Sequence, residues 1–313
     1  MKGIELCERF FFECGEPMLK RDFADILPLL AIGIAGSGSE CFGYDDEISR
    51  DHDFEPGFCI FIPDEELVDR KTEFALERAY ARLPKEFMGY KRSPLSPVGG
   101  NRHGVMRISA FLKSKTGTVD GCLQVRDWFY IPEQSLAEAT NGKIFFDGLG
   151  KISEARKRLE YMPEDVRLKK LAGNLLTMGQ AGQYNYGRCI SRGESAAAQL
   201  AVAEFVKATL NVAFLLNKKY IPYYKWSFRA LGELDTLSEL YSLLEYLLSS
   251  GNGEAEVERK KQTVELVCRT VTDKLINDGL ASECGTAIEA YAYAVNNKIS
   301  NAEIRNLHIL YAV

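Results

Sequence analysis

Residues 28–62 constrain the fold more than any other part of the chain. An apolar run over 29–35 stops at the turn 36–39, and a second apolar run covers 58–62. Apolar runs of this length beside glycine are typical of buried β-strands. Between the turn and the second run lies an acidic segment that ends in Asp51 and Asp53. The stretch therefore predicts two core strands with an acidic loop between them, followed by two aspartates on an extended segment that leads into the second strand.

The two aspartates suit a metal ion. On an extended backbone, residues two positions apart point to the same face, so Asp51 and Asp53 are expected to project together, with His52 on the other side. Adjacent carboxylates repel each other unless a cation lies between them, and Mg²⁺ prefers such oxygen ligands. The alternative is a solvated turn with capping acids. The Gly-Ser turn and the flanking strands favour the metal site.

The turn before the acidic segment predicts a phosphate contact at Gly38 and Ser39. Glycine allows a tight turn and lets backbone amides approach a ligand closely. If Ser39 opens a short helix, its free amides attract an anion. An ordinary Gly/Ser turn is the alternative. Among the loop acids Glu40, Asp45, Asp46 and Glu47, most are expected to be solvated, with Glu40 as the exception because it abuts the turn.

The order of these residues resembles the signature of the nucleotidyltransferase superfamily, whose fold is shared with DNA polymerase beta. There a Gly-Ser turn precedes an Asp-x-Asp strand by roughly a dozen residues, as Gly38-Ser39 precedes Asp51-His52-Asp53. The whole motif is similar to an uncharacterised bacterial group with a domain of unknown function, usually placed beside the aminoglycoside nucleotidyltransferases. The stretches 142–172 and 213–231 resemble the same group. The resemblance implies a nucleoside triphosphate and Mg²⁺ as ligands, with Asp51 and Asp53 as catalytic metal ligands.

The superfamily normally supplies a third carboxylate from a neighbouring strand, as metal ligand or general base. The strand expected within 103–112 carries none, which leaves Asp127, Asp147 and Glu40 as candidates. Two hypotheses follow. The first is a Mg²⁺-dependent enzyme that moves a nucleoside monophosphate from a nucleoside triphosphate to an unidentified small-molecule or protein acceptor. The second is a catalytically inactive protein of this fold that acts as a nucleotide sensor or as the partner of another protein.

The character of the chain changes near residue 150. Strand and helix patterns mix before it, and helical periodicity dominates from Ile152 onward. This order predicts an α+β fold, with a nucleotidyltransferase-like mixed sheet and helices over 1–150 and an all-helical domain over 151–313. The resemblance implies that the helical domain closes the cleft. The expected helices cover roughly 2–13, 16–27, 64–82, 193–220, 233–250, 254–279 and 283–296, and 84–103 is expected to be a loop.

The helical half holds a dense group of cations and aromatics at 217–229. Because the acidic first domain offers no cation near the motif, we expect Lys219, Tyr220 and Lys225 to bind the nucleotide and to face the aspartates. An ordinary helix end is the alternative. A second polar set, after Gly179, indicates either an acceptor pocket or a capped helix end: Gln180, Gln183, Tyr184, Asn185 and Arg188. Glu204 is either a general base or an exposed helical residue.

The composition of the chain limits the classes of partner and the cellular location that we expect. The 313 residues carry a net charge of −5, whereas proteins that bind nucleic acid non-specifically are usually basic. The eight cysteines are scattered without a C-x-x-C pair, which favours reduced thiols and a cytoplasmic location over disulfides or zinc. No uninterrupted apolar run is long enough to cross a membrane, and glutamates interrupt the N-terminal apolar stretch, which does not read as a secretory signal. The oligomeric state is left open.

Overall fold

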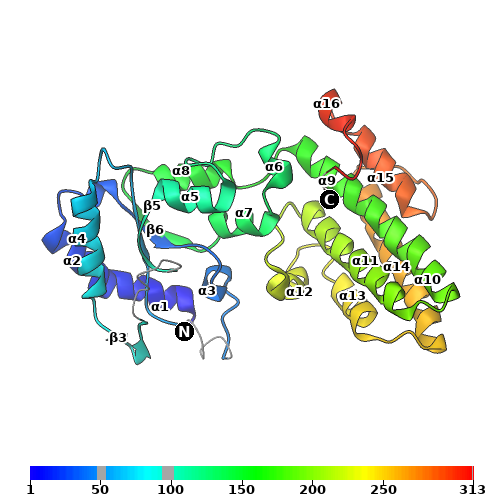
Figure 1. The fold of residues 1–313 in the computed structure, drawn as a ribbon, viewed down its shortest axis with the longest axis horizontal. Coiled ribbons are helices and arrows are strands. Elements are labelled where there is room, and N and C mark those ends of the chain that lie inside the picture. Colours follow the sequence, from blue (N-terminus) through cyan, green and yellow to red (C-terminus); the bar gives the residue numbers. More distant parts are fainter. Residues whose placement is uncertain (48–53, 94–101, 312) are drawn as a thin grey trace. The chain divides into compact units, whose positions relative to one another are not determined.

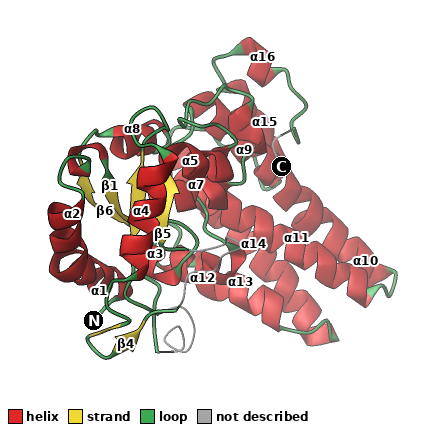
Figure 2. Ribbon diagram, turned by 60° about the vertical axis from the view of Figure 1, so that its left-hand side comes forward, coloured by secondary structure: helices red, strands yellow, loops and turns green. Residues whose placement is uncertain are grey.

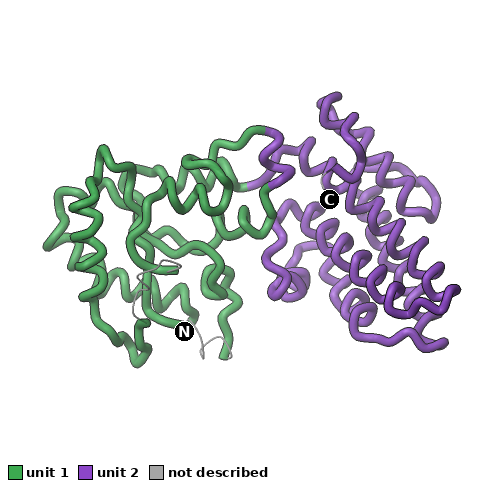
Figure 3. Tube along the Cα trace, viewed as in Figure 1, with its two compact units in different colours: residues 1–124, 131–160 green, residues 125–130, 161–313 purple. Residues whose placement is uncertain are grey.

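The computed structural model describes residues 1–47, 54–93, 102–311 and 313. The chain forms two compact units, shown in green and purple in Figure 3. Unit 1 comprises Met1–Gln124 and Ile131–Glu160, and unit 2 comprises Val125–Tyr130 and Tyr161–Val313. The residue 150 at which the sequence places a domain boundary falls inside the second segment of unit 1, and that boundary stays a prediction.

A four-stranded mixed sheet forms the centre of unit 1 (Figure 1). Its order is β5-β2-β1-β6; β2 runs antiparallel to β1 and parallel to β5, and β6 is antiparallel to β1. The strands are β1 (Ala31–Ile34), β2 (Cys59–Ile62), β5 (Gly104–Arg107) and β6 (Lys143–Asp147). The strands expected within 29–35, 58–62 and 143–147 are therefore confirmed.

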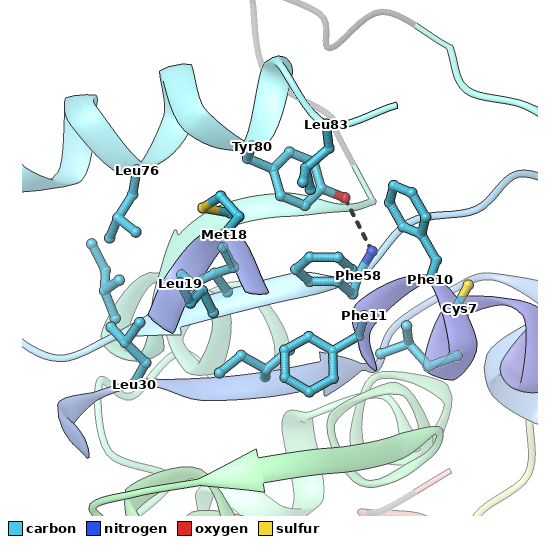
Figure 4. Packing of buried hydrophobic residues seen from close by; sticks show 14 of the residues in the cluster. Cys7, Phe10, Phe11, Met18, Leu19, Leu30, Phe58, Leu76, Tyr80 and Leu83 are labelled. Atoms are coloured by element: carbon cyan, nitrogen blue, oxygen red, sulfur yellow. Dashed lines mark hydrogen bonds between the residues drawn. The ribbon is translucent and has the colours of Figure 1, made fainter. Parts of the chain in front are cut away.

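One face of this sheet carries the core of the unit. Ile32 and Ile34 share a face because side chains alternate along a strand, and they pack with Ile60 of β2. The helices α1 (Gly3–Phe10), α2 (Glu16–Asp22) and α4 (Arg70–Ala81) contribute to the same cluster. Figure 4 shows the Phe58 backbone amide donating a hydrogen bond of 3.0 Å to the Tyr80 hydroxyl. This bond ties the start of β2 to α4.

Other helices of unit 1 accompany the strands (Figure 2). They are α3 (Ser39–Phe42), α5 (Ile108–Thr116), α7 (Glu133–Thr140) and α8 (Lys151–Arg158). Phe61 points to the face opposite Ile60 and meets Phe111 of α5 edge-on, with ring centroids 5.2 Å apart. Side chains from both faces therefore bury β2, which explains why its sequence is apolar at every position.

Three local expectations for unit 1 need correction. The helices expected over 2–13 and 16–27 are joined by a π-helical segment, Phe11–Gly15, because Gly15 packs so closely on the Phe58 ring that a Cβ there would lie 2.4 Å from it. Helix α4 begins at Arg70 rather than near 64, since Asp69 caps the amide of Thr72 at 2.8 Å.

The third correction concerns the expected loop 84–103. Its first part contains a hairpin, β3 (Glu86–Phe87) and β4 (Tyr90–Lys91). Met88 and Gly89 form its turn, and both have positive φ, 53° and 83°. Two residues of that kind match the twist of a hairpin, but the pair Met-Gly lacks the Asn-Gly or Asp-Gly signal by which such turns are recognised in a sequence.

Unit 2 is helical throughout the part that the structure describes. Its helices are α6 (Asp127–Tyr130), α9 (Glu164–Met178), the π-helix η4 (Gly179–Tyr186), α10 (Gly187–Ser191), α11 (Ser195–Leu216), α12 (Tyr224–Gly232), α13 (Leu240–Ser249), α14 (Glu254–Asn277), α15 (Ile288–Asn297) and α16 (Ala302–Arg305). Helix α9 packs against α11 and α15. With the mixed sheet of unit 1, this confirms the predicted α+β fold with a helical C-terminal region.

Helix α11 is the one helix in the described ranges that is long and apolar enough, by length and composition, to cross a membrane. Of its most apolar window, 61% is buried within the structure. Such burial is equally expected of the core helix of a bundle. Glu204 of α11 is exposed, as the alternative interpretation of this residue expects.

Most of the polar set after Gly179 does not lie at a helix end, although Arg188 is in the last turn of α10. Gly179 has helical dihedral angles, and α9, the π-helix and α10 run as one helix from Glu164 to Ser191. The capped end expected here is therefore wrong. The wide π-helical turns fit because Gly182 lies against Phe205, where a Cβ would come within 2.4 Å of the ring.

Candidate functional site

A cavity of about 500 Å³ lies in unit 1 at the carboxyl end of β1. Its wall begins with the last residue of that strand, Ile34, and continues through the turn Gly36, Ser37 and Gly38. The turn is fixed from outside by Asn141, whose side chain accepts from the Gly36 amide at 2.9 Å and donates to the Gly36 carbonyl at 2.7 Å. Cavities of this size are typical of small-molecule sites.

Glu40 is the acidic residue of the cavity wall. It lies in α3, which starts at Ser39 as the sequence predicts, and it is only 6% exposed. Its carboxylate folds back over the turn, so that a Cβ on Gly38 would lie 2.1 Å from Oε1. Glu40 therefore packs directly against Gly38, and a side chain at position 38 would displace its carboxylate. Glu40 is buried as expected, but Asp45 is buried too, because it accepts from the Gly3 amide at 2.9 Å at the start of α1.

His103 is buried beside Glu40 and also lines the cavity. Its Nε2 lies 3.9 Å from Glu40 and its Nδ1 lies 3.8 Å from Glu55, distances that allow ionic attraction but not a direct hydrogen bond. Burial alone would lower the pKa of His103, but the neighbouring Cys7 and Glu55 side chains and the charge of Glu40 raise it from 6.5 to about 9. These neighbours therefore favour the protonated form of the imidazole.

Glu55 is held in the same cluster. Burial would raise the pKa of Glu55, but His103 and the hydrogen bond donated by the Ser93 amide lower it from 4.5 to about 2. Gly57, two residues later, makes room for the imidazole, since a Cβ there would lie 2.3 Å from Nδ1 of His103. The segment that leads into β2 is thus packed against the wall of the cavity.

Two further cations line the cavity, Arg102 and Lys115. Arg102 lies 3.8 Å from the Glu40 carboxylate. Lys115, on α5, makes an ion pair of 2.5 Å with Glu138 of α7. Sequence reasoning missed Arg102, His103 and Lys115, and its premise that the first domain lacks cations near the motif is wrong. One signal was present in the sequence: two adjacent bases, Arg102 and His103, stand at the start of the stretch 103–112 in which a strand is expected.

The predicted metal ligands Asp51 and Asp53, with His52 between them, lie outside the described residues. Described residues resume at Phe54, and the next residue is Glu55, whose carboxylate contacts the cavity residue His103. Within 1–47, 54–93, 102–311 and 313, no group of three His, Cys, Asp or Glu side chains could hold a metal ion. The metal site stays a prediction.

The three candidates for the third carboxylate are placed differently. Glu40 lines the cavity. Asp147 pairs in register with Ala31, at the end of β1 opposite the turn, and caps the amide of Ser153 at 2.8 Å. Asp127 belongs to unit 2. Within unit 1 the structure therefore brings Glu40 to the turn and directs Asp147 away from it.

The cation group at 217–229 belongs to unit 2, and several members have local partners. Lys219 pairs with Asp235 at 3.0 Å, and the ammonium of Lys225 lies 4.9 Å from the Trp226 ring. Tyr220 meets Tyr161, with ring centroids 5.2 Å apart. Their contact with a nucleotide, and the idea that they face the aspartates, stay predictions.

The polar set around the π-helix also makes local contacts. Gln183 donates to Glu265 at 2.8 Å and accepts from the Ile288 amide at 3.0 Å. Arg188 donates to the Tyr184 hydroxyl at 2.8 Å. These bonds hold the π-helix to α14 and α15, which gives the set a structural role in unit 2.

Comparisons with known proteins give two matches. A family model described as a domain of unknown function (DUF4037) matches residues 128–227, about a third of the chain. The chain is also similar to the crystal structure of a nucleotidyltransferase-like protein from Exiguobacterium sibiricum 255-15, with 12% identity and a TM-score of 0.40, over 92% of this chain and 81% of that one. No curated protein matches. The expected likeness to a domain of unknown function is confirmed for 128–227, which excludes the Gly-Ser motif.

Proposed function

We propose that the chain is a Mg²⁺-dependent nucleotidyltransferase that moves a nucleoside monophosphate from a nucleoside triphosphate to a small-molecule or protein acceptor. The observation that carries this proposal is the cavity at the end of β1, where the glycine turn and the Glu40 carboxylate lie beside three cations. Glycine backbone lets phosphate oxygens approach closely, and cations balance their charge. The volume of about 500 Å³ suits a nucleotide-sized ligand.

In this proposal Asp51 and Asp53 hold the metal, and Gly38 and Ser39 lie against the phosphates. The contact between Glu55 and His103 supports it, since it anchors the residues that follow Asp53 to the cavity wall. Carboxylate oxygens, including that of Glu40, are the donors that Mg²⁺ prefers. When bound, the ion would supply charge neutralisation on the phosphates.

The reaction would be an in-line displacement at phosphorus. An acceptor oxygen forms a new bond to the α-phosphorus, the bond from that phosphorus to the bridging oxygen breaks, and pyrophosphate leaves with the electron pair. The proton of the acceptor passes to a nearby base or to water. The turn would orient the phosphates, and the apolar part of the wall, which includes Met106, Ala110 and Phe111, would exclude water. Positioning of this kind accounts for much of the rate in such reactions.

One observation favours the second candidate, an inactive nucleotide-binding protein. Glu40 is the one carboxylate among the described residues of the cavity wall and so the candidate there for the third metal ligand or base, and it already lies near Arg102 and His103. A carboxylate held by two cations is less available to a metal ion or to an incoming proton. The same cavity could then bind a nucleotide and report its presence to a partner without transferring it.

The experiment that tests the site replaces both aspartates, Asp51→Asn with Asp53→Asn. Calorimetric titration with non-hydrolysable nucleoside triphosphate analogues and Mg²⁺ should show affinity falling by about tenfold or more. The matched control, Glu66→Gln with Glu77→Gln, removes the same charge at two exposed positions and should bind like the wild type. Equal affinity in all three proteins would rule out the site. Pyrophosphate release from the natural triphosphates in a cell extract would separate the enzyme from the sensor.

A further inference from the structure

The cations of the cavity are unusual in an acidic chain. The net charge of the protein is −5, yet among the described residues the charged members of the cavity wall are three bases, Arg102, His103 and Lys115, and one acid, Glu40. Such a concentration of positive charge in a concave, partly apolar site attracts anions. The folding of the chain brings these bases together, because Lys115 lies on α5 and the other two bases precede β5.

Lys115 is the most informative of the three. Its side chain is 20% exposed and lines the cavity, and its ammonium group pairs with Glu138, whose side chain is 15% exposed and which is absent from the cavity wall. An ammonium group has three protons to donate, so the pair with Glu138 leaves donors for a second anion. Glu138 is thus a counter-ion of Lys115 that lies outside the cavity wall, whereas Lys115 itself lines the cavity.

The neighbouring residue Lys113 provides a contrast on the same helix. It is exposed and does not line the cavity, although it lies only two positions from Lys115. On a helix, residues two apart point to different faces. Any effect that depends on the total charge of α5 should be the same for both lysines, whereas an effect of the cavity should appear for Lys115 alone.

We propose that Lys115, together with Arg102, binds the phosphate chain of the ligand within unit 1, and that Glu138 is the internal counter-ion with which this phosphate competes. The inference rests on the proposed function for the identity of the ligand as a nucleoside triphosphate. The recognised chemistry is a polyphosphate anion, whether it is inorganic triphosphate or the triphosphate of a nucleotide. Neither Asp51 nor Asp53 is needed for this contact.

The test is calorimetric titration of the full chain with inorganic triphosphate and, separately, with ATP, both in the presence of EDTA. Lys115→Gln should weaken both affinities about tenfold, as expected for loss of one charge-assisted contact, whereas Lys113→Gln should change them less than about twofold. Lys115→Arg keeps the charge and should retain most of the binding. Glu138→Gln removes the competing anion and should tighten binding severalfold. Thermal unfolding of each variant reports whether the fold is retained.

Several outcomes would overturn the inference. Equal losses in Lys115→Gln and Lys113→Gln would show a non-specific charge effect, and unchanged or weaker binding in Glu138→Gln would remove the competition. Should Lys115→Gln fail to fold, Glu138→Gln still decides. Tighter binding of ATP than of triphosphate would indicate a nucleotide, and equal binding a free polyphosphate. If Asp51→Asn with Asp53→Asn keeps its metal-free binding while the wild type transfers nothing, the proposed function fails and this inference stands.

Discussion

The two cation-rich regions of the molecule are built differently. In unit 1, His103 and Lys115 are largely buried, line a cavity and have acids behind them. In unit 2, the side chains of Lys219 and its partner Asp235 are 46% and 80% exposed, and Lys225 is exposed beside Trp226. The cations of unit 1 differ because they are buried and line a cavity. Both properties make a cation available to a bound ligand rather than to solvent.

The largest expected difference between the regions is in the pH dependence of stability. The folded protein raises the pKa of His103 from 6.5 to about 9, so the stability this group contributes is fully present below 6.5 and is lost as pH rises through about 9. A shift of this size corresponds to about 3 kcal/mol. Among the described residues, the charged and titratable groups that face His103 are Cys7, Glu40 and Glu55, with Arg102 close to Glu40.

Chemical denaturation across this pH range should therefore show the free energy of unfolding falling more steeply in the wild type than in His103→Gln, where the thiols of Cys41 and Cys59, whose pKa values are raised by burial, still lower stability toward alkaline pH. The lowered pKa of Glu55 arises from the same attraction between Glu55 and His103, so it adds no separate contribution to the free energy of unfolding. As a control in unit 2, Lys219→Gln should leave the pH profile of the wild type intact, because exposed ion pairs contribute at most about 1 kcal/mol. A profile in His103→Gln with the same slope as the wild type would contradict the ionic cluster.

The smallest expected effect concerns the nucleotide itself. Lys219→Gln combined with Lys225→Gln should change the affinity for nucleoside triphosphate and Mg²⁺ by less than about twofold, since both cations lie on an exposed surface. Calorimetry of this double variant beside Lys115→Gln measures the contrast directly. A loss of about tenfold or more in the double variant would reverse the comparison and restore segment 217–229 as a nucleotide contact.

The centre of unit 1 was predictable because its signals are local. Apolar runs gave β1 and β2, and the glycine turn before Ser39 gave the start of α3. Helix α11 followed from its length and composition. Each of these elements depends on residues that are adjacent in the sequence, so tertiary packing did not change the secondary structure that the local pattern predicts.

The wall of the cavity was not predictable in the same way. Nothing in the sequence distinguishes Lys115 from Lys113. The packing of α5 alone decides that Lys115 lines the cavity and Lys113 does not. Asp147 was an open candidate until the antiparallel register of β6 placed it at the far end of β1. The π-helices at Phe11–Gly15 and Gly179–Tyr186 depend on glycines that meet the aromatic rings of Phe58 and Phe205, contacts between residues distant in sequence.

A crystal structure of the protein with a non-hydrolysable nucleoside triphosphate analogue and Mg²⁺ would show directly where the phosphates bind. The proposed placement has phosphate oxygens beside Gly38 and within hydrogen-bonding distance of Lys115, with the metal ion on Asp51 and Asp53. A nucleotide bound in unit 2, against Lys219 and Lys225 or along the π-helix, with no phosphate in the cavity at the end of β1, would contradict it.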